Sequence, residues 1–197
     1  MSKTEILDRL VEEGNGYLRT ALVLQNGVSK RTLSRYIQER QMERATHGVY
    51  MDKDAWPDDY FLLYLRNSRI VFSHESALYL NGLMDREPST TTVTVPKTYN
   101  STHISKLGVQ VIHAKSEWYV VGLTNIQTNF GNTVPVYDRE RTICDIVKNK
   151  KEIEIQTFQT AMKEYMSSRG KNLGNLISYA KVLGVESEVR MYTEVML

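Results

Sequence analysis

The stretch Asn26–Tyr50, NGVSKRTLSRYIQERQMERATHGVY, decides the fold of the first part of this chain. Asn26-Gly27 tolerates positive φ, so the chain can reverse sharply there. Ser29 is a favourable helix N-cap, because its hydroxyl can accept a hydrogen bond from the next turn. A turn followed by a capped helix is therefore expected. Apolar residues recur at helical spacing and form the inward stripe of that helix: Leu33, Tyr36 and Ile37.

The outward face of this helix carries hydrogen-bond donors and hydroxyls, with no carboxylate before Glu39. Between Ser29 and Gly48 there are five Lys or Arg residues and two Glu residues. Arg and Gln can read purine edges through paired hydrogen bonds, and a helix N-terminus favours phosphate. Lys30 and Arg40 suit phosphate contacts. The residues expected to enter a DNA major groove are Ser29, Lys30, Arg31, Thr32, Arg35 and Gln38.

The segment 42–50 predicts a two-stranded basic ribbon that turns near His47-Gly48. Arg44 and His47 are expected to face the DNA backbone or the minor groove. Arg19 begins a second predicted helix, 17–25, at the position where the first helix of a helix-turn-helix crosses the backbone. It is expected to contact phosphate, with a solvent-facing side chain as the alternative. Together these features predict a winged helix-turn-helix; a helical hairpin with a solvated basic face is the competing interpretation.

The length, net charge and cysteine count of the chain limit the class of protein. The 197 residues suggest one or two domains, and the net charge of +2 is too small to indicate a nucleic-acid partner by itself. The single cysteine, Cys144, allows no intramolecular disulfide. No signal-peptide pattern is present, and no apolar run approaches the roughly 18 residues of a membrane span. We therefore expect a cytoplasmic protein without membrane association.

Sites for metals, cofactors and catalysis are not expected. The four histidines, at positions 47, 74, 103 and 113, have no metal-ligand spacing. His74-Glu75 lacks the second histidine of a zincin motif, and Cys144-Asp145 has no adjacent base, so a buried, inert thiol is expected. These patterns argue against an enzyme. A basic cluster follows residue 138 and could extend a nucleic-acid footprint or form a solvated helix end: Arg139, Arg141, Lys148, Lys150 and Lys151.

Alternating β-branched segments predict a small sheet of three to five strands in the middle of the chain. Pro135, in the strand 133–137, favours an edge strand or a bulge. Asp138 is expected to cap a helix, and helices 156–168, 172–183 and 186–196 complete the chain. The predicted fold class is α+β. The expected domains are a winged helix-turn-helix with connecting helices, 1–85, and a mixed α/β domain with a small sheet and C-terminal helices, 86–197.

Four stretches together resemble the AbiEi antitoxin family of bacterial AbiE abortive-infection, type IV toxin–antitoxin systems. They are the basic segment ending in Gly48-Val49-Tyr50, then FSHESALYLNGL (72–83), TVTVP (92–96) and VYDRERTICD (136–145). The resemblance covers essentially the whole chain. It implies an N-terminal domain that binds inverted repeats in its own promoter and represses transcription. It also implies a C-terminal domain that counteracts the AbiEii toxin, a nucleotidyltransferase-like protein, without a stable complex.

One winged domain covers few base pairs, so specific binding calls for two copies on an inverted repeat, with self-association on DNA. Two alternatives remain open: a different DNA-binding regulator, and an antitoxin that sequesters its toxin by direct binding. An enzyme that reverses a toxin's modification is the least favoured, since no catalytic constellation is present.

Overall fold

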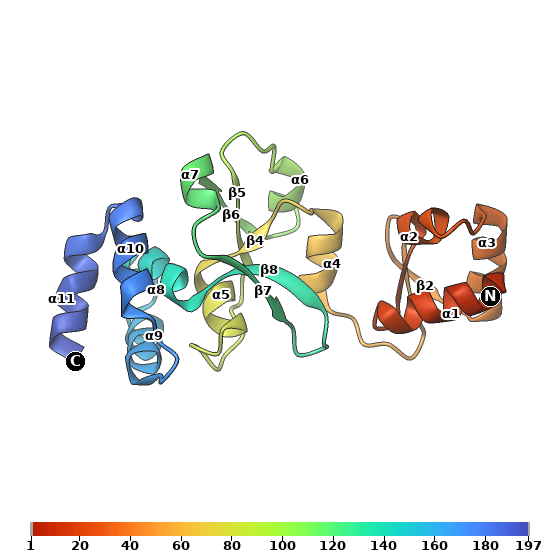
Figure 1. Cartoon of the computed structure of the whole chain (residues 1–197). Helices are drawn as coiled ribbons and strands as arrows, with labels where there is room; N and C mark the ends of the chain where they lie inside the picture. Colours follow the sequence, from red (N-terminus) through yellow and green to blue (C-terminus); the bar gives the residue numbers. More distant parts are fainter. Residues whose placement is uncertain (1, 197) are drawn as a thin grey trace. The chain divides into compact units, whose positions relative to one another are not determined.

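The computed structural model describes residues 2–196 and shows a mixed α+β chain with two small sheets (Figure 1). Its contacts divide it into two compact units. The amino-terminal unit holds the chain up to Ser68 together with Gln127–Thr133, and the carboxy-terminal unit holds Arg69–Ile126 and the chain from Val134 onward. The boundary expected at residue 85 lies inside the carboxy-terminal unit, because the segment after Ser68 supplies a central strand and a helix of the larger sheet.

The amino-terminal unit alternates short helices and strands. Its three-stranded antiparallel sheet has the order β1-β3-β2, so the first strand pairs with the last. Its elements are α1 (Lys3–Glu13), β1 (Tyr17–Arg19), α2 (Thr20–Gln25), α3 (Lys30–Glu39), β2 (Glu43–Thr46), β3 (Val49–Met51) and α4 (Asp59–Arg66).

Local sequence explains most of these boundaries. Ser2 accepts a hydrogen bond from Glu5 N, and the Glu5 carboxylate accepts one from Ser2 N, a capping box that begins α1. The predicted helix 17–25 is wrong in its first turn, because Tyr17–Arg19 pairs with β3 and only Thr20–Gln25 is helical. Its partner strand lies about thirty residues later in the chain, so helical periodicity alone could not reveal the pairing.

One apolar core joins α1, α2 and α3 with the first strand of this unit. Of the predicted inward stripe of α3, Leu33 and Tyr36 are buried and Ile37 is half-buried. Val28, the apolar residue of the turn, is 1% exposed. The buried core residues are Leu7, Leu10, Leu18, Val23, Val28, Leu33, Tyr36 and Met42.

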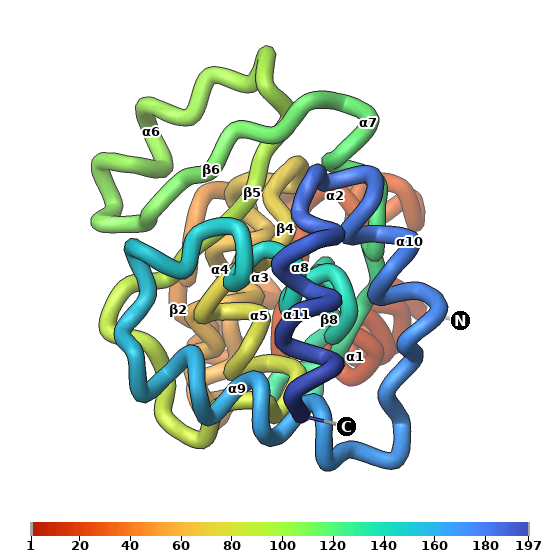
Figure 2. Tube along the Cα trace, turned by 90° about the vertical axis from the view of Figure 1, so that its left-hand side faces the viewer, coloured from red at the N-terminus to blue at the C-terminus, as the bar shows by residue number. Residues whose placement is uncertain are grey.

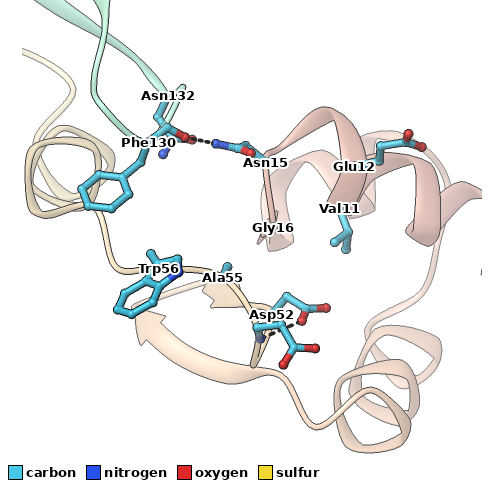
Figure 3. Close-up of a pocket in the computed structure, with 10 residues that line it drawn as sticks. Val11, Glu12, Asn15, Gly16, Asp52, Ala55, Trp56, Phe130 and Asn132 are labelled. Atoms are coloured by element: carbon cyan, nitrogen blue, oxygen red, sulfur yellow. Dashed lines mark hydrogen bonds between the residues drawn. The ribbon is translucent and has the colours of Figure 1, made fainter.

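Asp58 is a fully buried carboxylate that caps α4 and binds the turn between β7 and β8. Its Oδ1 accepts from Phe61 N at 3.0 Å, and its Oδ2 accepts from Thr128 Oγ1 at 2.6 Å and from Asn132 Nδ2 at 2.8 Å. Its own N–H donates to Tyr17 Oη at 2.9 Å. Asn15 also donates to the carbonyl of Phe130 (Figure 3). The turn 127–133 is therefore part of the amino-terminal unit although it lies far along the chain.

We expect Asp58→Ala to lower the free energy of unfolding by about 2–4 kcal/mol, because three buried or half-buried donors lose their acceptor. Thr128→Val removes one of those bonds and should cost about 1–2 kcal/mol. Urea unfolding followed by circular dichroism measures both. Asp54→Ala, at an exposed carboxylate, is the control and should leave the midpoint unchanged. A loss below about 1 kcal/mol for Asp58→Ala would contradict this role.

The carboxy-terminal unit contains a five-stranded mixed sheet of order β6-β5-β4-β8-β7. β4 pairs antiparallel with β5 and parallel with β8, and β5 pairs parallel with β6. Its elements are β4 (Val71–Phe72), α5 (His74–Leu80), β5 (Thr92–Pro96), α6 (Thr102–Ser105), β6 (Gln110–Ala114), α7 (Ser116–Tyr119), β7 (Leu123–Gln127), β8 (Thr133–Tyr137), α8 (Arg139–Lys148), α9 (Ile155–Ser167), α10 (Leu173–Leu183) and α11 (Glu186–Met196).

Pro135 is expected on an edge strand or at a bulge, because proline has no N–H to donate. The expectation of an edge strand is wrong. β8 runs between β4 and β7. β4 is only two residues long, and its register pairs Phe72 with Val136. The ladder beside Pro135 is therefore short, and the missing donor removes little of it.

The helices α8 to α11 form the main core of this unit. α8 packs against α5, α9, α10 and α11, and the tube in Figure 2 shows its position among them. Asp138 caps α8 as expected, accepting from Arg141 N at 2.8 Å. Because every residue from Glu140 to Val147 is buried, α8 carries polar side chains inside the unit as well as apolar ones.

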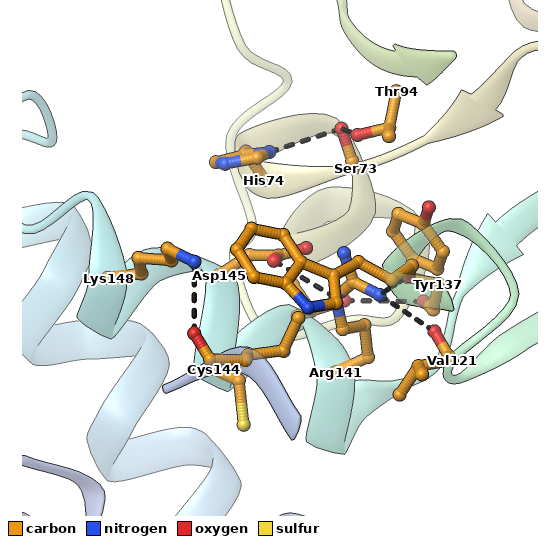
Figure 4. Close-up of polar contacts among 12 residues, drawn as sticks. Ser73, His74, Thr94, Val121, Tyr137, Arg141, Cys144, Asp145 and Lys148 are labelled. Atoms are coloured by element: carbon orange, nitrogen blue, oxygen red, sulfur yellow. Dashed lines mark hydrogen bonds and ion pairs between the residues drawn. The ribbon is translucent and has the colours of Figure 1, made fainter. Parts of the chain in front are cut away.

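Arg141 and Asp145 form a buried ion pair on α8 (Figure 4). Arg141 Nε lies 3.0 Å from Asp145 Oδ1, and the side chains are 4% and 7% exposed. The guanidinium also donates to the carbonyls of Trp118 and Val121 and lies 4.1 Å from the centre of the Tyr137 ring. Arg141 thus ties α8 to α7 and to the loop that follows it.

Arg141→Met should lower the free energy of unfolding by about 3–5 kcal/mol, because it leaves the Asp145 carboxylate buried without a counter-charge. The double variant Arg141→Met with Asp145→Leu should recover most of that loss, since it removes both charges. Chemical denaturation measures both variants. If the double variant were as unstable as the single one, packing and carbonyl contacts, not the ion pair, would explain the loss.

Candidate nucleic-acid interface

The turn before α3 has the geometry that its sequence indicates. Gly27 adopts φ +70°, and Val28 N donates to Val23 O at 3.1 Å. Ser29 caps α3 by accepting from Thr32 N at 3.1 Å, and its hydroxyl lies 2.9 Å from Thr32 Oγ1. The hydroxyls of Ser29 and Thr32 are therefore engaged with one another at the N-terminus of the helix.

Helix α3 separates an apolar side from a polar side. Leu33 and Tyr36 are buried, whereas the residues expected to contact DNA from this helix are largely exposed. Within residues 2–196, neither Lys30 nor Arg31 has an ion pair or a side-chain hydrogen bond. Arg35 Nε lies 3.5 Å from Glu39 Oε1, an exposed pair that contributes little. The exposed side chains of this face are Lys30, Arg31, Ser34, Arg35 and Gln38.

Arg40 is held by α1. Its Nη2 lies 2.7 Å from Asp8 Oδ1, which also accepts from Tyr36 Oη at 2.7 Å. Burial, followed by the contact with Asp8, raises the pKa of Tyr36 to about 12, so this hydroxyl remains the donor. The side chain of Arg40 is still 54% exposed.

Strands β2 and β3 form the expected ribbon and turn at His47-Gly48, where Gly48 has φ +70°. Arg44 Nη2 lies 3.1 Å from His47 Nδ1, and both side chains are exposed. Arg19 is exposed at the end of β1, opposite Val49, and Thr20 N donates to Gly48 O at 2.8 Å. The sheet therefore places Arg19 beside the tip of the ribbon.

Arg66 supports this ribbon from α4 and was not predicted from the sequence. Its Nε donates to Thr46 Oγ1 at 2.8 Å, and its Nη2 donates to Ala45 O at 3.4 Å. Nothing in the local sequence marks this role, because α4 and β2 are separated by the loop that follows β3. Only the tertiary structure assigns Arg66 to the base of the ribbon.

Charge is separated within the amino-terminal unit. The unit contains ten Lys or Arg residues and ten Asp or Glu residues. Six of the cations but only two of the acids lie in the segment 15–51, which includes α2, α3 and the ribbon. The unit is therefore neutral in total, and its basic character is confined to the segment that carries the candidate interface.

Comparisons with known proteins bear on the fold. No protein-family model matches the chain, and no curated protein matches it. Among solved structures, the chain is similar to the one described as "Crystal structure of RV2827C protein from Mycobacterium tuberculosis". The TM-score is 0.56 and the sequence identity is 11%, over 97% of this chain and 80% of that chain. This likeness supports the mixed α+β architecture.

Most cations of the second basic cluster, after residue 138, have partners within the chain, although its three lysines are exposed. Arg141 is buried in its ion pair, and Arg139 donates to Asn81 O at 3.0 and 3.2 Å. Lys148 Nζ donates to Leu183 O at 2.9 Å, and Lys150 Nζ donates to Tyr192 Oη at 2.6 Å. Four of the five cations therefore make internal contacts, which the charge run alone could not indicate.

His74 and Ser73 form a buried polar link (Figure 4). His74 has φ +51°, its Nδ1 lies 3.1 Å from Ser73 Oγ, and its Nε2 lies 2.5 Å from Asn149 Nδ2. Ser73 Oγ also accepts from Thr94 Oγ1 at 2.9 Å. These contacts join α5, β5 and the end of α8. Ser73 is fully buried, so its hydroxyl is not accessible to solvent.

Two negative findings apply to residues 2–196. No group of three or more His, Cys, Asp or Glu side chains in this range could hold a metal ion. No helix in the same range combines the length and apolar character needed to cross a bilayer.

Cys144 is fully buried, and burial raises the pKa of its thiol to about 12. At pH 8 only about one such thiol in ten thousand is ionised, against about a quarter for an ordinary cysteine. We therefore expect no alkylation by iodoacetamide in the native protein at pH 8 and rapid alkylation after denaturation. Mass spectrometry measures the modification. Modification of the native protein within minutes would contradict the burial of this thiol.

Proposed function

We propose that the amino-terminal unit is a winged helix-turn-helix that binds double-stranded DNA. In this proposal α2 and α3 are the helix-turn-helix, α3 is the recognition helix, and the ribbon β2–β3 is the wing. The observation that carries the proposal is the exposed face of α3, where Lys30 and Arg31 have no protein partner within residues 2–196 and Ser29 caps the helix.

The order of elements supports this interpretation. One helix and one short strand precede the two helices, a two-stranded ribbon follows them, and the first strand completes the sheet beside the last. Winged helix-turn-helix domains are typically built in this order. The sheet also pairs Arg19 with Val49, near the tip of the ribbon that carries His47, so the wing and the start of α2 can both contribute cations for phosphates.

Each residue then has a distinct role. Lys30, at the N-terminus of α3, suits a phosphate, and the helix dipole adds to its attraction. Arg31, Arg35 and Gln38 can reach base edges in the major groove. The wing residues Arg44 and His47, together with Arg19 and Arg40, suit the backbone or the minor groove. A single domain reads few base pairs, so we propose that two copies bind an inverted repeat in the chain's own promoter.

The resemblance to the AbiEi family extends the proposal to an antitoxin. Under it, the chain represses its own promoter through the amino-terminal unit and counteracts a nucleotidyltransferase-like toxin through the carboxy-terminal unit, in the bacterial cytoplasm and without a stable complex. The resemblance, not a residue of the carboxy-terminal unit, supports this second role.

Arg31→Ala and Arg35→Ala should each weaken binding to the native promoter by about 1–3 kcal/mol, because each removes a base or phosphate contact. Loss of a phosphate contact should also reduce the slope of log K against log salt by about 0.9. Fluorescence anisotropy on the DNA upstream of the coding sequence measures both quantities. Lys53→Ala removes an exposed cation from the acidic loop after β3 and is the matched control.

The DNA-binding proposal fails if the double variant of Arg31 and Arg35 binds the promoter as tightly as the unaltered chain. Equal loss in the Lys53 variant would show attraction by total charge and not by the α3 face.

The antitoxin role has a separate test. Co-expression of the full chain with the toxin should restore growth, and the Arg31 and Arg35 double variant should restore it equally when its expression is driven from a foreign promoter. Failure of the unaltered chain to restore growth would remove this role and leave a DNA-binding regulator. Co-purification of chain and toxin as a stable complex would favour sequestration instead.

A further inference from the structure

The amino-terminal unit has a second feature outside the DNA-binding face, a pocket of about 500 Å³. Its lining comes from the end of α1, from the loop after β3 and from the turn 127–133, all within this unit. Figure 3 shows the rings of Trp56 and Phe130 at one end of the pocket, with Asp52 and Glu12 toward the other.

The two rings are unusually exposed for their size. Trp56 is 77% exposed and Phe130 is 47% exposed. Large aromatic side chains are normally mostly buried, and neighbouring exposed rings are typical of binding surfaces. Both rings therefore offer apolar surface to the pocket that they line.

The backbone that carries each ring is anchored. The carbonyl of Trp56 accepts from Tyr17 Oη at 3.2 Å, two residues before the buried Asp58. Phe130 N donates to Thr128 Oγ1 at 3.3 Å, and the Phe130 carbonyl accepts from Asn15. The rings are thus presented by fixed segments, which lowers the entropy lost on binding a ligand.

The charged residues of the lining are all acidic. Glu12, Asp52 and Asp54 are among the lining residues, and none of the residues that line the pocket is a cation. Glu12 lies in the last turn of α1, which has no basic residue, so the negative end of that helix dipole is not offset there. Lys53 reaches Asp54 only at 3.7 Å, in an exposed pair. A cation is the ligand that matches this charge.

We propose that this pocket binds an arginine side chain of a basic segment in a partner protein. A guanidinium is planar and can stack on Trp56 and Phe130, while the carboxylates attract its charge. Arginine fits better than lysine because its flat, weakly hydrated group loses less on leaving water for an aromatic wall. The negative lining disfavours nucleic acid, so the site is distinct from the α3 face and does not depend on DNA binding.

The test uses the full chain labelled with 5-fluorotryptophan, which gives one ¹⁹F signal for each of its two tryptophans, Trp56 and Trp118. A Trp56→Phe variant assigns the signals. The probe is the peptide acetyl-Gly-Arg-Gly-Arg-Gly-amide, with matched peptides that carry lysine or citrulline in place of arginine. We expect the arginine peptide to shift the Trp56 signal saturably and to leave the Trp118 signal, in the other unit, unchanged.

Variants assign the effect to the pocket. Glu12→Gln and Asp52→Asn should each lower the affinity for the arginine peptide about fivefold at low salt, because each removes a nearby charge that contributes about 1 kcal/mol. Phe130→Ala should weaken it about threefold by removing part of the stacking wall. Glu13→Gln is the matched control, because Glu13 is the next residue of α1 but does not line the pocket.

Three results would overturn the proposal. The first is no shift of the Trp56 signal at millimolar arginine peptide. The second is an equal shift with the citrulline peptide, which would show a purely apolar pocket. The third is equal binding of the lysine peptide or of spermidine, which would show general attraction of cations. Loss of promoter binding in the α3 variants would leave all of these results unaffected.

Discussion

The amino-terminal unit depends on one buried carboxylate. Asp58 accepts from Thr128, Asn132 and the first turn of α4, and its own N–H donates to the hydroxyl of Tyr17 on β1. A buried carboxylate without a cation is stable only when hydrogen bonds satisfy it, so each of these partners is held in place by the same requirement. The unit therefore includes a turn that lies about seventy residues later in the chain.

That constraint also determines what the surface of the unit presents. The turn held by Asp58 carries Phe130, and the loop that leads to Asp58 carries Trp56, so two exposed rings line the pocket beside the end of α1. The cations, by contrast, are concentrated in the segment that forms α2, α3 and the ribbon. A unit with no net charge can thus present one surface suited to phosphate and another suited to a cation.

The carboxy-terminal unit uses its charges differently. Arg141 forms a buried ion pair with Asp145. Arg139 donates to the Asn81 carbonyl at the end of α5, and Lys148 donates to the Leu183 carbonyl at the end of α10. Removing one partner of a buried ion pair is costly, because the other charge then stays buried without compensation. These contacts connect α8 to α5, α10 and the loop after α7.

The sequence by itself determined the α+β class, the capped basic helix α3, the ribbon turning at His47-Gly48, and the four carboxy-terminal helices, because caps, periodicity and turn residues act within a few positions. The exposed basic face of α3 was also predictable, since helical spacing alone separates Arg31 and Arg35 from Leu33 and Tyr36. Only the tertiary structure decided that Tyr17–Arg19 is a strand, that Pro135 lies inside the sheet, that Arg66 supports the ribbon, and that residues 127–133 belong with the first unit. Those outcomes depend on partners many residues away. Local patterns do not show which distant segment will pair with a strand or form hydrogen bonds with a guanidinium or a buried carboxylate.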